Sequence, residues 1–302
     1  MKHGPYIFLG LLFALALSWL GMVATPQLQL SNQQPTNVPP SNVIYPTPYS
    51  GQANLGRDVY RANGCAYCHT QVVRQEGTRL DVVLTKAGTN EAAVVQALMQ
   101  IKPGRSQAEA QSLVASAPKT VLSVATKAQA DAAQKALTGA DAEATVRVVP
   151  LGPDIERGWG RRVSVGSDYL YATPLMLGNV RLGPDLANIG ARQTNEAWHL
   201  IHLYDPKLTS PGSTMPRYPF LFEKRARKGE PAPDSLPVPG AIDVIPTREA
   251  RALATYLADL KSELPLFEAP GPALPAAVPQ APTTNAPAAS TNQPSASPSV
   301  TK

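Results

Sequence analysis

The sequence is poor in the residues that build metal centres, with two cysteines and four histidines in 302 residues. A structural zinc site normally takes four ligands, mostly cysteine and histidine, and the local supply here falls short. The net charge is only +5, and no dense run of lysine and arginine is present. The composition therefore excludes a basic nucleic-acid-binding surface and points to chemistry concentrated at one place.

That place is residues 65–69, where Cys65, Cys68 and His69 form a C-x-x-C-H motif. The motif is typical of covalent c-type haem attachment: each thiol adds to one vinyl group, and the histidine supplies the first axial iron ligand. A thioredoxin-like C-x-x-C motif needs a strand–helix context and has no histidine requirement. We therefore predict one covalent haem c. Its attachment commits both cysteines, which excludes disulfides, and requires a compartment outside the cytoplasm.

Charged residues are absent from residues 5–24, which are mostly apolar. A helix of this length, at about 1.5 Å per residue, spans the roughly 30 Å hydrocarbon core. The alternative is a cleaved signal peptide, but the run is long and a proline closely follows the small residues at its end. We expect an uncleaved transmembrane anchor over 1–26. Lys2 favours the amino end inside and the remainder outside.

Proline is abundant, at 31 residues, and many lie in two stretches. Residues 27–51 are rich in Pro, Asn, Gln and Ser, which predicts an extended linker. Residues 265–302 consist mainly of Pro, Ala, Thr, Ser and Asn and predict a disordered tail. The folded part is then expected at 52–79 and 150–264, interrupted by a separate segment at 80–149.

Two amphipathic helices are expected in the folded part. The first begins near Gln52, with Leu55, Val59 and Ala62 on one face, and ends at Gly64 just before the cysteines. The second covers 247–261, with an apolar stripe of alanines and leucines.

The segment 80–149 has a separate pattern of predicted secondary structure. Strands are expected at 81–85, 120–124 and 144–149, and helices at 90–101, 106–117 and 127–137. The order is βααβαβ. Residues 81–88, 109–118 and 128–137 resemble the C-terminal domain of the bacterial ribosomal stalk protein. The resemblance implies a small α/β sandwich. Ala108 and Gln111 occupy places where that domain's factor-binding face is basic, so we interpret the segment as a spacer or docking module.

Residues 179–190 contain Gly183 and Pro184 in a Gly-Pro-x-Leu pattern. After a C-x-x-C-H motif, this pattern resembles class I c-type cytochromes. The resemblance implies that the Pro184 carbonyl accepts the proton on the far nitrogen of His69 and so orients the ligand.

The sixth iron ligand has several candidates outside the anchor: Met99, Met176, Met215, His199 and His202. Met99 is expected in the core of the inserted segment, and Met176 in packing. Met215 lies in a proline-stiffened loop after the Gly-Pro-x-Leu segment, which fits the distal ligand of class I cytochromes. A thioether ligand raises the haem potential relative to a second imidazole. Met215 is the predicted ligand, with His199 or His202 as the alternative.

A narrower resemblance covers nearly all of the chain outside the inserted segment and the tail. Residues 56–60, 64–71, 164–171, 181–186, 198–206 and 213–221 are similar to the mono-haem subunit II of cbb3-type cytochrome c oxidases. The resemblance implies a mainly α protein in which one transmembrane helix carries a class I cytochrome c domain, interrupted by the α/β insert. It adds Arg181 as a predicted cofactor contact.

We therefore expect a single-pass inner-membrane subunit with its haem domain on the periplasmic side. It would pass electrons from another c-type cytochrome subunit to the b haem of the catalytic haem–copper subunit, with no bond chemistry of its own. The alternatives are a nitric oxide reductase cytochrome c subunit and a haem-bearing adaptor whose insert recruits a partner. With four histidines, the chain itself is too poor in ligands for a copper–haem centre.

Overall fold

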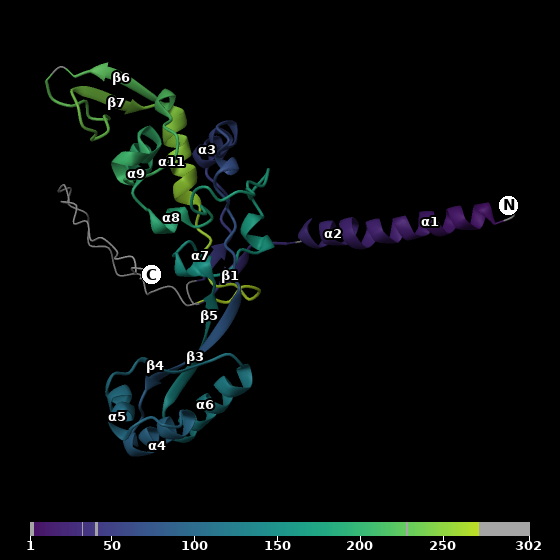
Figure 1. Ribbon diagram of the computed structural model, residues 1–302, viewed down its shortest axis with the longest axis vertical. Helices are drawn as coiled ribbons and strands as arrows, with labels where there is room; N and C mark the ends of the chain where they lie inside the picture. Colours follow the sequence, from purple (N-terminus) through teal and green to yellow (C-terminus); the bar gives the residue numbers. More distant parts are fainter. Residues whose placement is uncertain (1–2, 32, 40–41, 228, 272–302) are drawn as a thin grey trace, which may run out of the picture.

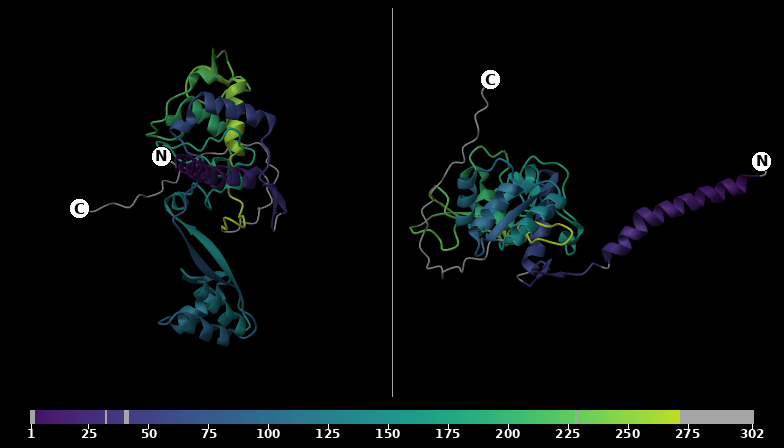
Figure 2. Two further views of the ribbon diagram at one scale, coloured as in Figure 1. Left: turned by 90° about the vertical axis from the view of Figure 1, so that its right-hand side faces the viewer. Right: turned by 90° about the horizontal axis from the view of Figure 1, so that it is seen from below.

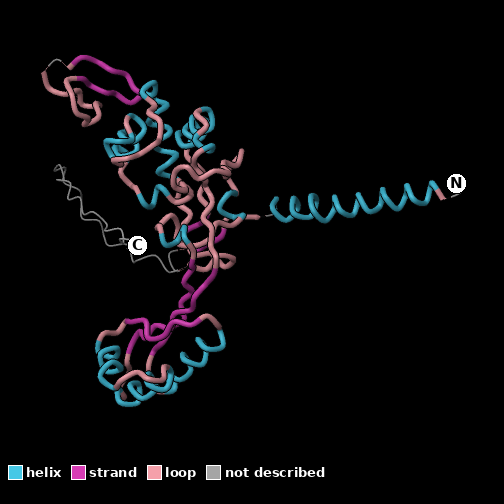
Figure 3. The backbone as a smooth tube through the Cα atoms, viewed as in Figure 1, coloured by secondary structure: helices cyan, strands magenta, loops and turns pink. Residues whose placement is uncertain are grey.

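The computed structural model describes residues 3–31, 33–39, 42–227 and 229–271. Three parts are distinct in Figure 1: an N-terminal helix, a region made mostly of helices and loops, and a smaller part built on a sheet. Seen from below, the N-terminal helix projects away from the other parts (Figure 2, right). The chain passes twice between the helical region and the sheet part (Figure 3).

The N-terminal helix is continuous but changes its winding. It consists of α1 (Gly4–Trp19), a π-helical turn (Leu20–Ala24) and α2 (Thr25–Ser31). Pro26 has no backbone N–H to give to a carbonyl in the preceding turn, and a proline in a helix interior perturbs the turn before it. Within the described ranges, residues Gly4–Gln29 form the one helix long and apolar enough to cross a membrane.

The predicted linker is not extended throughout. Strands β1 (Thr36–Val38) and β2 (Val43–Tyr45) form an antiparallel hairpin. Leu266 and Ala269, which composition assigns to the disordered tail, are buried against it. The Tyr45 hydroxyl donates to Asp168 at 2.6 Å, so the hairpin is also bound to the helical region. The composition of the segment does not predict the packing of Leu266 and Ala269, because only a few apolar side chains form it. Residues 272–302 of the predicted tail lie outside the described residues.

The helical region is organised around α3 (Gly51–Ala62) and α11 (Arg248–Asp259), which pack closely together. Gly56 makes this possible, because a Cβ there would lie 1.9 Å from the carbonyl oxygen of Ala252. The buried face of α3 also includes Ala53, Val59 and Tyr60, whereas Ala62 is exposed and Leu55 half-buried. The prediction of the buried face was therefore confirmed for Val59 and wrong for Ala62, and Leu55 lies at the edge of that face.

The remaining elements of this region are short. They are η2 (Cys65–Tyr67), α7 (Pro153–Glu156), η3 (Gly166–Tyr169), α8 (Ile189–Arg192), α9 (Glu196–Tyr204), α10 (Pro206–Thr209), η4 (Pro219–Leu221) and the antiparallel hairpin of β6 (Phe222–Ala226) and β7 (Ile242–Pro246). One core joins η2, α8, α9, η4 and the β6–β7 hairpin to α3 and α11, with Leu186, Leu200, Leu203, Val244 and Leu253 among its buried members.

The sheet part, here called the sheet module (77–151), has the expected order of elements. It consists of β3 (Gly77–Lys86), α4 (Glu91–Ile101), α5 (Gln107–Ala115), β4 (Lys119–Val124), α6 (Lys127–Gly139) and β5 (Glu143–Leu151). The antiparallel strand order is β4-β3-β5. Asn90, Ser106 and Thr126 cap the three helices through their side-chain oxygens, which explains where each helix begins.

Strands β3 and β5 are longer than expected and link the sheet module to the helical region (Figure 1). Their pairing extends to Gly77 opposite Leu151, where the chain enters and leaves the module. Both ends of the segment therefore lie together, which lets the module interrupt the helical region in sequence without separating its halves in space.

Candidate functional site

A cavity of about 540 Å³ lies in the helical region. This volume is within the range of small-molecule and cofactor pockets. Cys65, Cys68, His69, Pro184, His202 and Met215 are among its lining residues. Parts of the chain on both sides of the sheet module thus form one concave site.

The C-x-x-C-H segment follows α3 through a sharp change of direction. Gly64 has a φ of 66°, a left-handed conformation that glycine adopts without strain. The turn η2 then begins at Cys65, and the backbone N–H of His69 donates to the Cys65 carbonyl at 3.0 Å. This compact turn presents both thiols and the imidazole to the same cavity.

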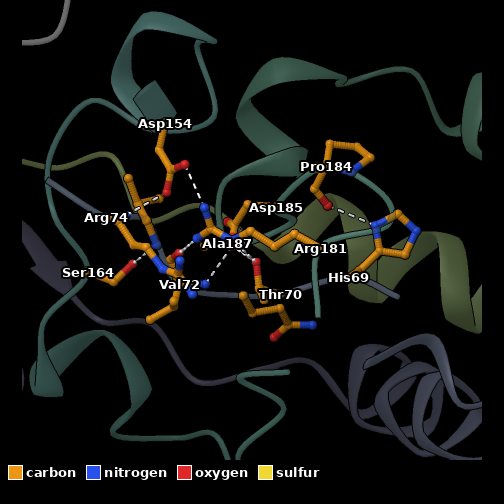
Figure 4. Close-up of polar contacts among 12 residues, drawn as sticks. His69, Thr70, Val72, Arg74, Asp154, Ser164, Arg181, Pro184, Asp185 and Ala187 are labelled. Atoms are coloured by element: carbon orange, nitrogen blue, oxygen red, sulfur yellow. Dashed lines mark hydrogen bonds and ion pairs between the residues drawn. The ribbon is translucent and has the colours of Figure 1, made fainter. Parts of the chain in front are cut away.

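His69 contacts the segment that carries Gly183 and Pro184, 115 residues away in sequence. Its Nδ1 lies 2.8 Å from the Pro184 carbonyl oxygen (Figure 4). A carbonyl only accepts, so Nδ1 carries the proton and Nε2 presents a lone pair. Gly183 packs so closely that a Cβ would lie 2.3 Å from His69 Cε1. The predicted contact of Pro184 is present; its role in orienting an iron ligand stays a prediction.

Met215 lines the same cavity from the loop after α10. The loop is bound to the end of α9 in two ways. Tyr218 N–H donates to the Leu203 carbonyl at 3.0 Å, and Arg217 pairs with Asp205 at 2.7 Å. These contacts join the two sequence motifs around residues 202–206 and 213–219, so the loop has a defined place beside the cavity.

The other ligand candidates are placed differently. Met176 is buried in the core, as expected, whereas Met99 is exposed on α4 because it lies on that helix's outer face, contrary to its expected core position. His199 is buried and its Nε2 bonds the Gln193 carbonyl at 2.8 Å. His202 lines the cavity, stacks on Trp198 and bonds Thr209 through Nδ1 at 2.5 Å. His199 lines the cavity as well, so both histidines stay as alternatives to Met215.

Arg181, predicted from the resemblance as a cofactor contact, keeps that role only as a prediction. It is not among the described residues that line the cavity. Its guanidinium is directed elsewhere (Figure 4), pairing with Asp154 at 2.6 Å and donating to the Val72 carbonyl at 2.6 Å and to Thr70 Oγ1 at 2.9 Å. Arg181 therefore braces the backbone behind His69, a role that motif position alone does not distinguish from cofactor binding.

Burial dominates the electrostatics of the cavity. It lowers the pKa of His69, opposed by the Pro184 carbonyl and the charge of Asp185. Burial, with smaller contributions from His69 and His199, lowers the pKa of His202 to about 4, and burial raises the pKa of the Cys65 thiol to about 11. His69, His202 and the Cys65 thiol are therefore neutral around pH 7.

Sequence reasoning missed two supports of the site. Gly178 has a φ of 67°, and a Cβ there would lie 2.4 Å from the His69 carbonyl oxygen. The Asp185 carboxylate is fully buried and accepts from Thr70 and Val72 (Figure 4). A carboxylate after Gly-Pro suggests only a turn, because its partners lie more than 100 positions away in sequence.

The chain thus combines an apolar N-terminal helix that is long enough to cross a membrane with a concave site in its helical region. The family described as "Cytochrome C oxidase, mono-heme subunit/FixO" matches residues 94–260, more than half of the chain. The chain belongs to this family, the mono-haem subunit of cbb3-type oxidases. The matched residues include Pro184 and Met215 and begin within α4, beyond the C-x-x-C-H motif.

A second likeness concerns a 73-residue segment. It is 45% identical to the large ribosomal subunit protein bL12 of Ralstonia nicotianae, covering 24% of this chain and 58% of that protein. The same protein of Kocuria rhizophila is 44% identical, covering 24% and 56%. The chain thus spans somewhat over half the length of these relatives. The likeness fits the inserted module and confirms the resemblance seen in the sequence.

Proposed function

We propose that this protein is the mono-haem electron-transfer subunit of a cbb3-type haem–copper oxidase. The observation that carries the proposal is the convergence of Cys65, Cys68, His69 and Met215 on one cavity, with His69 bonded to Pro184. The family supports membrane association and assembly with a cbb3 oxidase complex.

The helical region is proposed to be a class I cytochrome c domain. The close crossing of α3 and α11 supports this, because the helix before the C-x-x-C-H motif and the C-terminal helix cross in that fold. The proposed domain is formed by 52–79 with 150–264, and the insert by 80–149.

Four side chains would hold the haem. Cys65 and Cys68 would form its thioether links, and His69 and Met215 would ligate its iron. Haem fits this donor set, because imidazole and thioether are established axial ligands and the two thiols have the attachment spacing. When bound, the haem supplies one-electron transfer between a c-type haem donor and the b haem of the catalytic subunit.

The chain's own residues prepare this site in advance. Pro184 keeps the proton on His69 Nδ1, which directs Nε2 toward a metal and fixes the ring. The loop contacts of Arg217 and Tyr218 hold Met215 in place, which limits the rearrangement needed when the charge on a metal changes. The anchor would keep the domain on the extracytoplasmic side of the membrane, beside its partner subunits.

Purification of the intact complex tests this function. We expect one covalent haem on this chain, and oxygen consumption that is driven by reduced cytochrome c and lost when the chain is removed. A complex that reduces nitric oxide but is inert toward oxygen would contradict the proposal and identify the nitric oxide reductase alternative.

The adaptor function is favoured by one specific observation, the separateness of the sheet module and its likeness to a ribosomal protein domain. Removal of the module tests it within the complex. Unchanged turnover together with loss of a bound protein would support recruitment by the module as an additional role.

A further inference from the structure

The carboxylate of Asp185 is the centre of a buried polar cluster directly behind His69. The side chain is fully buried. Its Oδ2 accepts from Thr70 Oγ1 at 2.6 Å and from Val72 N–H at 2.8 Å, and its Oδ1 accepts from Ala187 N–H at 2.9 Å. All three donors are oriented toward a charged acceptor, so the cluster suits an ionised carboxylate.

This carboxylate joins two strips of backbone that carry the iron-ligand geometry. Gly183 N–H donates to the Cys68 carbonyl at 3.0 Å, and Leu186 N–H donates to the Thr70 carbonyl at 2.7 Å. Asp185 adds the third connection, to Thr70 and Val72. The Pro184 carbonyl lies between these connections, so its direction toward His69 depends on them.

We propose that Asp185 is a positioning residue that fixes the Pro184 carbonyl on His69 and, through its charge, sets the reduction potential of the site. The inference rests on the proposed function, since it requires His69 to ligate haem iron. Asp185 itself does not touch the cofactor; it acts through Pro184 and through the field of a buried negative charge.

Arg181 extends the cluster to the base of the sheet module. Its Nη2 lies 3.7 Å from Asp185 Oδ2, and its Nη1 bonds Asp154, which also accepts from the Arg74 N–H at 2.7 Å (Figure 4). Arg74 and Asp154 lie just outside the two ends of the module. The cluster therefore connects the chain across the insertion and supports the histidine side of the site.

The test is Asp185→Asn in the full-length holoprotein in detergent, with the midpoint potential measured by spectroelectrochemistry. Asparagine has a similar shape but carries no negative charge. Its NH₂ group is a donor, so it cannot accept from all three donors that surround Asp185. The lost charge favours the reduced form directly, and a looser Pro184 carbonyl favours it by making His69 a weaker electron donor to the iron. We expect reduction to become about tenfold more favourable, or about 59 mV for one electron, with haem attachment intact.

The matched control is Asp243→Asn, another buried carboxylate, which pairs with Arg227 at 2.9 Å in the hairpin of β6 and β7. It should lower stability without moving the potential. An Asp185→Asn protein with full haem loading and the wild-type potential would overturn the inference, as would an equal shift in the control.

Thr70→Val is a second variant in case Asp185→Asn does not fold. It removes one donor to Asp185 and keeps the charge, so only the hold of Asp185 on the Pro184 carbonyl is weakened. A smaller shift toward the reduced form is expected from this effect, and an unchanged potential would overturn the inference. Failure of the proposed function would be distinct, because the wild-type chain would then carry no covalent haem and no potential could be assigned to it.

Discussion

The sheet module and the helical region around the cavity are stabilised in different ways. In the module, buried residues such as Val82, Leu98 and Leu137 belong to elements that follow one another closely in the chain. In the helical region, essential contacts join distant positions, such as Gln71 with Tyr256 across 185 residues. The module can fold from one continuous segment, whereas the cavity needs chain from both sides of the module.

This difference explains how one part can interrupt the other. Because Gly77 pairs with Leu151, the module closes on itself and returns the chain to where it left. The cost of closing a loop grows only slowly with its length, so an insertion at such a point is tolerated. The comparison predicts that substitutions at the cavity leave the module intact, and that the module can be removed without loss of the cavity.

The largest expected effect comes from Cys65→Ser combined with Cys68→Ser. Covalent attachment should be abolished, since a hydroxyl does not replace a thiol in the thioether links. Haem staining after denaturing electrophoresis measures the loss, and resistance of the sheet module to proteolysis should be unchanged. Haem that stays on the denatured double variant would contradict the assignment of these cysteines.

Met215→His is expected to keep the haem while changing its ligand set. The weak far-red charge-transfer band expected of a His/Met haem should disappear, and the potential should fall because imidazole replaces thioether. Optical spectra and redox titration measure both. Met176→Leu is the control and should retain the band; persistence of the band in Met215→His would show that another methionine is the ligand.

Gly183→Ala should have a moderate effect confined to the cavity. The new Cβ would lie 2.3 Å from the His69 ring, and such overpacking typically costs about 1–3 kcal/mol. Thermal unfolding and haem loading measure the result. Gly51→Ala is a matched control, because nothing lies within 4 Å of its Cβ. Equal behaviour of the two variants would contradict the close packing against His69.

The smallest effect on the haem spectrum is expected when residues 80–148 are replaced by Asn-Gly. Arg79 and Val149 face each other across β3 and β5, and Asn-Gly suits a two-residue hairpin turn. Arg74, Asp154 and Arg181 remain in place, so the spectrum and potential should stay as in the wild type. A loss of haem attachment would show that the module is needed for the helical region to fold.

Elements with signals that are local in the chain were predicted from the sequence, whereas contacts between residues far apart in the chain were not. The helices α3 and α11 and the six module elements were predicted, since caps and apolar periodicity are local signals. The hairpins β1–β2 and β6–β7 were missed, because short paired strands have weak local patterns. The packing of Leu266 was missed for the same reason: its partners, Val38 and Tyr45, lie far away in the chain.

Residues alone were enough to recognise the motif at 65–69, the apolar N-terminal segment, the order of the module's elements and the family to which the chain belongs. These features depend on residue identity and short spacing. Only the folded structure reveals that Arg181 bonds Asp154 and the Val72 carbonyl and that Asp185 is buried behind His69. The physical reason is that a buried charge is tolerated only where distant backbone and side-chain donors surround it, and folding alone brings those donors together.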